Sequence, residues 1–175
     1  MSERLYGLVR DVPDFPKPGI LFRDITPVLL DPEAMVEAVN ALTHPLRGLG
    51  VTKVVAIESR GFLLGSPVAM ALGVGLVIVR KPGKLPAGVH RVEYDLEYGT
   101  DAVEVHADAL GARDRAAIVD DVLATGGTAR AAAELVERSG ARVSGFSFLI
   151  ELADLGGRAR LGARAVHAVL RYPRA

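Results

Sequence analysis

Short apolar runs that alternate with helical segments restrict the fold of this chain more than any other feature of its sequence. The strand-length runs cover residues 51–57, 76–79, 116–119, 143–150 and 166–170. Apolar residues at helical spacing fill intervals between them, as in 59–72 and 128–139. Strands that alternate with helices form parallel βαβ units. The sequence therefore predicts an α/β fold in which helices flank a central, mostly parallel sheet.

Two segments depart from this alternation. Four prolines between Val12 and Pro27 predict an irregular first thirty residues. The pair Asp31-Pro32 then predicts a helix start, because Asp is a favoured N-cap and Pro a favoured first helical residue. Residues 92–107, VEYDLEYGTDAVEVHA, alternate with period two around a Gly-Thr-Asp turn, which predicts an antiparallel hairpin. With 175 residues, the chain is expected to form one domain, 1–175.

Charge and composition exclude several classes of protein. The chain has 21 basic and 21 acidic residues, so no global field recruits DNA or anionic lipid. The uncharged stretch 61–79 is long enough to span a bilayer, but Pro67 and Gly73-Val-Gly75 indicate a helix followed by a strand. There is no cysteine for a disulfide framework, and the N-terminus lacks the apolar core of a signal peptide. We therefore expect a cytoplasmic protein with no nucleic-acid or membrane partner.

The stretch AAIVDDVLATGGTA, residues 116–129, carries the most specific chemistry. Glycines at 126 and 127 free backbone N–H groups at a helix N-terminus, where a phosphate is favoured. Asp120 and Asp121 would repel a phosphate, but as hydrogen-bond acceptors they suit ribose hydroxyls or the water around Mg²⁺. Together these groups outline a ribose 5-phosphate site. The alternative is an ordinary capped helix after a strand, which a TGGT turn alone would favour.

Two further stretches follow predicted strands and are basic. Arg60, in ESRGF, and the lysines of RKPGKLP, residues 80–86, could grip a diphosphate. The alternative for each is a solvated basic loop. Ligands of parallel sheets bind where strands end, so all three stretches are expected to converge in space. The arginines of residues 156–175 are instead expected to form a solvated face.

These motifs resemble known ones. IVDDVLATGGT is similar to the phosphoribosyl-diphosphate-binding motif of type I phosphoribosyltransferases. FPKPGILFRDITPVLLDP, at 15–32, resembles the amino-terminal hood of adenine phosphoribosyltransferases, and YDLEYGTD, at 94–101, resembles their mobile catalytic hairpin. The resemblance is colinear over roughly residues 12–155. It implies the type I phosphoribosyltransferase fold, with a hood over 1–30 and a mobile loop and hairpin over 81–106.

The resemblance to the adenine phosphoribosyltransferase family also implies a reaction. Adenine and phosphoribosyl diphosphate would give AMP and pyrophosphate, a step of purine salvage. Mg²⁺ would enter with the substrate near Asp120 and Asp121 rather than on direct protein ligands, and the protein would be a homodimer. The implied phosphoribosyl-diphosphate contacts are Asp120, Asp121, Ala124, Thr125, Gly126, Gly127 and Thr128. The implied pyrophosphate contacts are Ser59, Arg60, Gly61, Lys81 and Lys84. Glu97 would exchange a proton with the base at N7, and adenine would meet Leu21, Phe22 and Arg23.

Two other functions stay open at this point. A phosphoribosyltransferase for a 6-oxo purine would need a donor near O6, and no motif places one. A regulator that binds phosphoribosyl diphosphate without catalysis would be expected to carry an added DNA-binding module. The 175 residues leave no room for such a module, and a net charge of zero does not favour DNA binding. Formation of a nucleotide with adenine, with another purine or with none separates the three.

Overall fold

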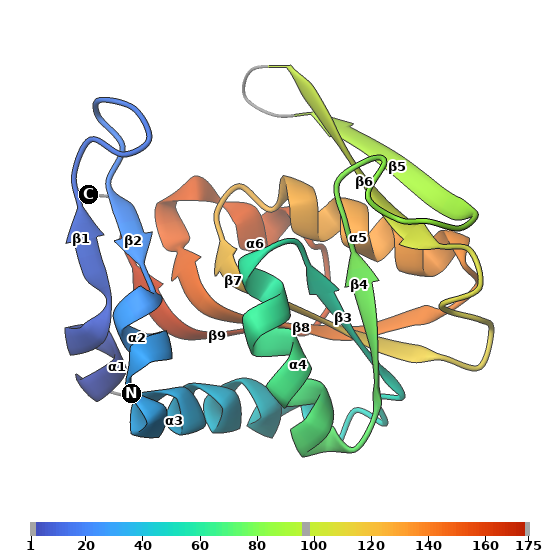
Figure 1. The fold of residues 1–175 in the computed structure, drawn as a ribbon, viewed down its shortest axis with the longest axis horizontal. Helices are drawn as coiled ribbons and strands as arrows, with labels where there is room; N and C mark the ends of the chain where they lie inside the picture. Colours follow the sequence, from blue (N-terminus) through green and yellow to red (C-terminus); the bar gives the residue numbers. More distant parts are fainter. Residues whose placement is uncertain (1–2, 96–98, 174–175) are drawn as a thin grey trace.

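The computed structural model describes residues 3–95 and 99–173, and its centre is a five-stranded parallel sheet (Figure 1). The strands are β3 (Lys53–Ile57), β4 (Gly75–Val79), β7 (Arg115–Leu123), β8 (Arg142–Leu152) and β9 (Val166–Tyr172), in the spatial order β4-β3-β7-β8-β9. All four pairings between them are parallel. The predicted α/β class with a mostly parallel sheet is confirmed.

The two faces of the sheet carry different partners. Successive strand residues point to opposite faces, so Val55 packs toward one core and Val54 toward the other. The first core lies under α5 (Gly127–Arg138) and a two-stranded hairpin. The second lies under α3 (Pro32–Thr43) and α4 (Arg60–Leu72). Figure 1 shows α5 and the hairpin on one side of the sheet and α3 and α4 on the other.

The amino-terminal segment is more regular than predicted. It contains α1 (Glu3–Leu8), the strands β1 (Arg10–Val12) and β2 (Phe22–Asp24), and α2 (Thr26–Leu30). The expectation of an irregular segment is wrong because these elements are too short for periodicity to reveal, and tertiary burial of Leu5 and Ile25 stabilises them. The predicted helix start is confirmed, since the Asp31 side chain accepts from the amides of the first turn of α3. A 3₁₀ turn, His44–Leu46, follows α3.

The predicted hairpin is confirmed as β5 (Val89–Asp95) and β6 (Thr100–His106), which pair antiparallel in a sheet of their own. The predicted position of its turn is wrong, because Thr100 and Asp101 pair with Asp95 and Tyr94 as residues of β6. Val92, Val103 and Val105 bury its inner face in the core beneath α5.

In the stretch tested as a bilayer span, residues 61–79, α4 is terminated by Gly73, which adopts a left-handed conformation, and β4 follows. Over the described residues, no helix combines the length and apolarity needed to cross a membrane.

Strand β7 is longer than predicted. Strand β7 extends through Leu123, so Asp120 and Asp121 lie inside it rather than after it. The extension follows from pairing with β8, whose residues Phe148 and Ile150 lie opposite Asp120 and Val122. Beyond β8 come a 3₁₀ turn, Ala153–Leu155, and the short helix α6 (Gly157–Arg160).

Candidate active site

The two aspartates of β7 occupy different environments. Asp121 is buried, with its side chain 8% exposed, and forms an ion pair with Arg60. Asp120 is half-buried, and its Oδ1 accepts from the Asp121 amide at 2.9 Å. Burial, followed by the charge of Asp121, raises the pKa of Asp120 well above its ordinary value. At the end of β7, the Asp121 carboxylate is therefore already paired with a cation, whereas the ionised form of Asp120 is disfavoured.

The glycine turn after β7 forms a small hollow of about 90 Å³. Its lining is Asp120, Val122, Leu123, Ala124, Thr125, Gly126, Gly127, Thr128 and Ala129. Gly126 has a φ of 81°, at which a residue with a side chain would be strained, and α5 begins at the next residue. Free backbone N–H groups at the start of a twelve-residue helix favour an anion the size of a phosphate.

The glycine turn that forms the hollow packs against α6, a helix that the sequence analysis did not predict. A Cβ on Gly157 would overlap the carbonyl oxygen of Ala124, so only glycine lets α6 approach the turn this closely. Nothing in the local sequence marks Gly157, because its role depends on a contact with a residue 33 positions earlier.

The start of α4 is packed tightly against β7. A Cβ on Gly61 would lie 2.7 Å from Oδ1 of Asp120, so any larger residue here would have to displace the Asp120 carboxylate. The neighbouring Arg60 turns toward Asp121, and Ser59 precedes the helix without capping it through its side chain. Residues 59–61 and 120–121 are thus brought together, as their positions at strand ends predict.

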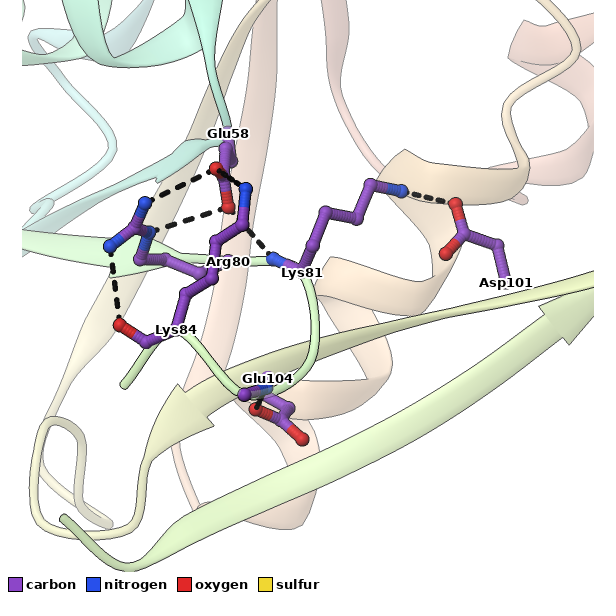
Figure 2. A network of polar contacts seen from close by, with 7 residues as sticks. Glu58, Arg80, Lys81, Lys84, Asp101 and Glu104 are labelled. Carbon is purple, nitrogen blue, oxygen red and sulfur yellow. Dashed lines mark hydrogen bonds and ion pairs between the residues drawn. The ribbon is translucent and has the colours of Figure 1, made fainter. Parts of the chain in front are cut away.

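The basic loop after β4 is anchored on Glu58, the residue before SRGF (Figure 2). Arg80 donates to the Glu58 carboxylate at 3.2 and 3.3 Å, Lys84 at 2.6 Å, and the Lys81 amide at 2.9 Å. Burial alone would raise the pKa of Glu58, but the bonds from Lys84, the Lys81 amide and Arg80 lower it to about 2. Of the cations proposed for a diphosphate, Lys84 is therefore already paired with Glu58, which it shares with Arg80.

Lys81 reaches in the opposite direction, toward the hairpin (Figure 2). It forms an ion pair with Asp101 of β6, and its Nζ lies 2.9 Å from the Tyr94 hydroxyl. Burial lowers the pKa of Lys81, but the bonds to Asp101 and Tyr94 outweigh it and the net shift is upward. The Tyr94 hydroxyl also lies 3.2 Å from the hydroxyl of Thr128. Basic loop, hairpin and glycine turn thus meet at Tyr94, which the sequence did not single out.

The hood approaches the Arg60–Asp121 pair at the end of β7 through Phe22. The guanidinium carbon of Arg60 lies 5.0 Å from the centre of the Phe22 ring, and Phe15 packs edge-on against that ring at 5.2 Å. Leu21 and Phe22 are half-buried. The predicted base-contacting segment therefore borders the Arg60–Asp121 pair. Glu97, the predicted proton-exchanging residue, lies outside the described residues.

The carboxylates at the end of β7 suit a hard cation that keeps other oxygen ligands. Within residues 3–95 and 99–173, no group of three or more His, Cys, Asp or Glu side chains is placed to hold a metal ion. Mg²⁺ is commonly held by one or two carboxylates together with water and substrate phosphates. Asp120 and Asp121 lie where they could accept hydrogen bonds from the water around such a substrate-borne ion.

The arginine-rich carboxyl end is not simply a solvated face. Arg158 donates to both oxygens of the buried Glu151 at 2.9 and 2.5 Å, and to the Val166 carbonyl at 2.6 Å. Arg164 pairs with Glu137 of α5. The expectation for these two arginines is wrong, because their carboxylate partners lie on elements that sequence spacing cannot pair with them.

Comparison with known proteins agrees with this geometry. A model of the phosphoribosyl transferase domain family matches residues 29–158. An adenine phosphoribosyltransferase of Methylococcus capsulatus is 55% identical over 170 residues, which are 97% of this chain and 99% of the relative. A crystal structure of the enzyme of that name from Thermoanaerobacter pseudethanolicus superposes with a TM-score of 0.95 at 48% identity, covering 97% of this chain and 99% of that one. The Saccharomyces cerevisiae enzyme, solved with an imino-altritol bisphosphate and adenine, gives 0.90 at 40% identity, covering 95% and 96%.

Proposed function

The chain belongs to the adenine phosphoribosyltransferase family, and we propose that it transfers the 5-phosphoribosyl group from phosphoribosyl diphosphate to adenine, releasing AMP and pyrophosphate. The observation that carries this function is the junction at the end of β7. There Asp120 lines a phosphate-sized hollow and accepts a hydrogen bond from the amide of Asp121. Asp121 in turn forms an ion pair with Arg60. The product AMP places the activity in purine salvage.

The sugar phosphate would be held by β7 and the turn after it. Backbone N–H groups of residues 124–128, with the hydroxyls of Thr125 and Thr128, would bind the 5-phosphate. Asp120 and Asp121 would accept hydrogen bonds from the ribose hydroxyls. Their negative charge also favours the oxocarbenium-like sugar that forms as the bond to diphosphate breaks.

The diphosphate would be bound by residues of the 59–61 turn and the basic loop. Arg60, Lys81 and Lys84 would stabilise the charge that the leaving group gains. Each is paired with a carboxylate in the free protein, namely Asp121, Asp101 and Glu58. Substrate binding would therefore exchange these internal partners for phosphate oxygens.

We propose that Mg²⁺ is carried by the substrate near Asp120 and Asp121, where it would neutralise charge on the diphosphate oxygens. The two carboxylates would orient it together with the ribose hydroxyls. A nearby cation would favour the ionised form of Asp120, whose pKa burial and the charge of Asp121 otherwise raise.

Adenine is proposed to bind along the hood strand. Main-chain groups of Leu21 and Arg23 would recognise its edge, and the Phe22 ring would supply apolar contact. Glu97 would accept the proton that leaves N7 during synthesis and donate it in the reverse reaction. The contact of Phe22 with Arg60 supports this arrangement, since the base must lie beside the sugar and diphosphate it attacks.

The protein is proposed to act as a homodimer in the cytoplasm. An apolar face on α4 and the adjoining edge strand β4 supports the dimer, because Leu63, Met70 and Leu76 are exposed there. Strand β4 leads directly into the basic loop at residues 80–84.

Incubation with phosphoribosyl diphosphate, Mg²⁺ and single purines tests the function. We expect AMP with adenine and no nucleotide with hypoxanthine, guanine or xanthine. Nucleotide from a 6-oxo purine alone would support the other base specificity. No nucleotide with any purine, while phosphoribosyl diphosphate still binds, would support the non-catalytic regulator.

A further inference from the structure

The hood strands β1 and β2 are too short to be stable without support. Each has three residues, and in the described part of the chain each pairs only with the other. Isolated two-stranded ribbons are at best marginally stable in water. A backbone that recognises a base to within a hydrogen-bond length therefore needs an anchor elsewhere in the molecule.

The side chain of Arg23 supplies a link to the main sheet. It forms an ion pair with Asp11, its direct cross-strand partner, and is only 11% exposed. Its guanidinium carbon lies 4.2 Å from the centre of the Tyr172 ring, a cation–π distance. Since Tyr172 is the last residue of β9 and pairs with Leu152 of β8, Arg23 joins the hood to the central sheet.

Tyr172 is itself held in place by α1. Its ring packs edge-on against Tyr6 at 5.1 Å. The Tyr6 hydroxyl accepts from the Arg171 amide at 2.8 Å and donates to the Arg171 carbonyl at 3.0 Å. The hydroxyl of Tyr172 is buried, and within the described residues it has no hydrogen-bond partner. The ring of Tyr172, rather than its hydroxyl, is therefore the part that meets Arg23.

The neighbouring residue on β2 faces the candidate active site. Phe22 contacts Arg60, which is paired with Asp121, whereas Arg23 points to Asp11 and Tyr172. Alternate strand residues point in opposite directions. The same three-residue strand thus presents one side chain to the substrate site and uses the next as its anchor.

We infer that the Arg23 side chain, clamped between Asp11 and Tyr172, is a positioning group that sets the affinity for the purine base. This rests on the proposed function, in which main-chain groups of Leu21 and Arg23 meet adenine. The side chain acts through the backbone it holds and does not itself contact the base. Weakening the clamp raises the KM for adenine and leaves the KM for phosphoribosyl diphosphate unchanged.

Steady-state kinetics of three variants test this inference. For Arg23→Met and Tyr172→Leu we expect the adenine KM to rise roughly tenfold, as for the loss of a partly buried cation–π and ion-pair contact. We expect the KM for phosphoribosyl diphosphate to stay within about twofold and kcat to change less than the adenine KM. Asp11→Asn keeps the packing and removes only the charge of a side chain that is 53% exposed, so it gives a smaller rise in a folded protein.

Conservative and matched variants complete the design. Tyr172→Phe keeps the ring and should restore the adenine KM lost in Tyr172→Leu. Arg10→Gln removes the other cross-strand ion pair of the ribbon, to Asp24 at 3.4 Å, and should leave both KM values unchanged. An unchanged adenine KM in Arg23→Met and Asp11→Asn, or an equal rise in both KM values, would overturn the inference. Failure of the wild type to form AMP would instead overturn the proposed function.

Discussion

At the scale of single residues, the fold shifts the pKa values of two carboxyl groups near the site in opposite directions. Asp120 is forced toward its neutral form by burial and by Asp121, while Glu58 is held ionised by three donors. Groups with strongly shifted pKa values concentrate at functional sites. The two carboxylates therefore make opposite contributions to stability, and each contribution can be measured.

Asp120→Asn is expected to stabilise the fold and impair activity. Because the folded-state pKa lies above the ordinary value of 3.8, ionised Asp120 costs free energy at neutral pH, and Asn removes that cost. We expect Tm to rise by about 2–4 °C, as for roughly 1 kcal/mol in a chain of this size. Thermal unfolding measures this, with Asp121→Asn as the contrast, since loss of the partner of Arg60 should lower Tm. A lower Tm in Asp120→Asn would contradict the account.

Glu58→Gln should remove part of the acid sensitivity of the protein. The folded-state pKa is about 2, below the ordinary 4.5, so the contribution of Glu58 is fully present above pH 4.5. It is lost as the pH falls from 4.5 toward 2. Urea unfolding across this window should show a smaller decline in the free energy of unfolding for Glu58→Gln than for the wild type. Glu93→Gln, at an exposed pair, should follow the wild-type profile, and an identical decline in all three proteins would refute the prediction.

Glu97→Gln tests the proposed proton exchange. An amide cannot accept the proton from N7, so we expect kcat to fall by about 100-fold or more, the usual contribution of a general base. The affinity for phosphoribosyl diphosphate should change little, because the base is handled separately from the diphosphate. Glu93→Gln, four residues earlier in the chain, serves as the control in the same assay. Equal turnover in Glu97→Gln and the wild type would reject the assignment.

At the scale of elements, the sheet, its crossovers and the hairpin were predictable because each has a local signature. Asp31 marks the start of α3, and alternation of apolar residues with period two marks the strands of the hairpin. The roles of Glu58 and Tyr94 were not predictable, because each depends on side chains that only the fold brings close. The ligand-facing motifs are local stretches of sequence, whereas the residues that hold them are scattered along it.

Gly157→Ala should disturb the phosphate-sized hollow from outside. The new methyl group would overlap the Ala124 carbonyl oxygen, and relieving an overpacked contact costs about 1–3 kcal/mol. We expect a lower Tm and a higher KM for phosphoribosyl diphosphate, with the KM for adenine much less affected. Gly111→Ala, where a Cβ would meet no atom within 4 Å, is the matched control. Retention of the wild-type KM for phosphoribosyl diphosphate would show that the turn does not depend on α6.

At the scale of the whole molecule, three substructures meet around one position of the sheet. The hood contributes Phe22, the hairpin Tyr94, and the end of β7 its aspartates. Figure 1 shows the hood ribbon β1–β2 and the hairpin β5–β6 rising on either side of the strand ends. Base, diphosphate and sugar would thus be recognised by separate parts of the chain, so changes in one part should alter one substrate's KM selectively.

The exposed apolar face also belongs to this scale, since the proposed homodimer would bury it. Met70 is 83% exposed and lies two helical turns from Leu63 on α4, with Leu76 on the adjoining edge strand. Burying such a side chain contributes about 1.5–3 kcal/mol, and a charge placed there would reverse the gain. We expect sedimentation to show a dimer for the wild type and a monomer for Met70→Glu. Val36→Glu, at an exposed apolar residue of α3, should remain dimeric. A monomeric wild type, or a dimer that survives Met70→Glu, would refute α4 as the contact between two copies.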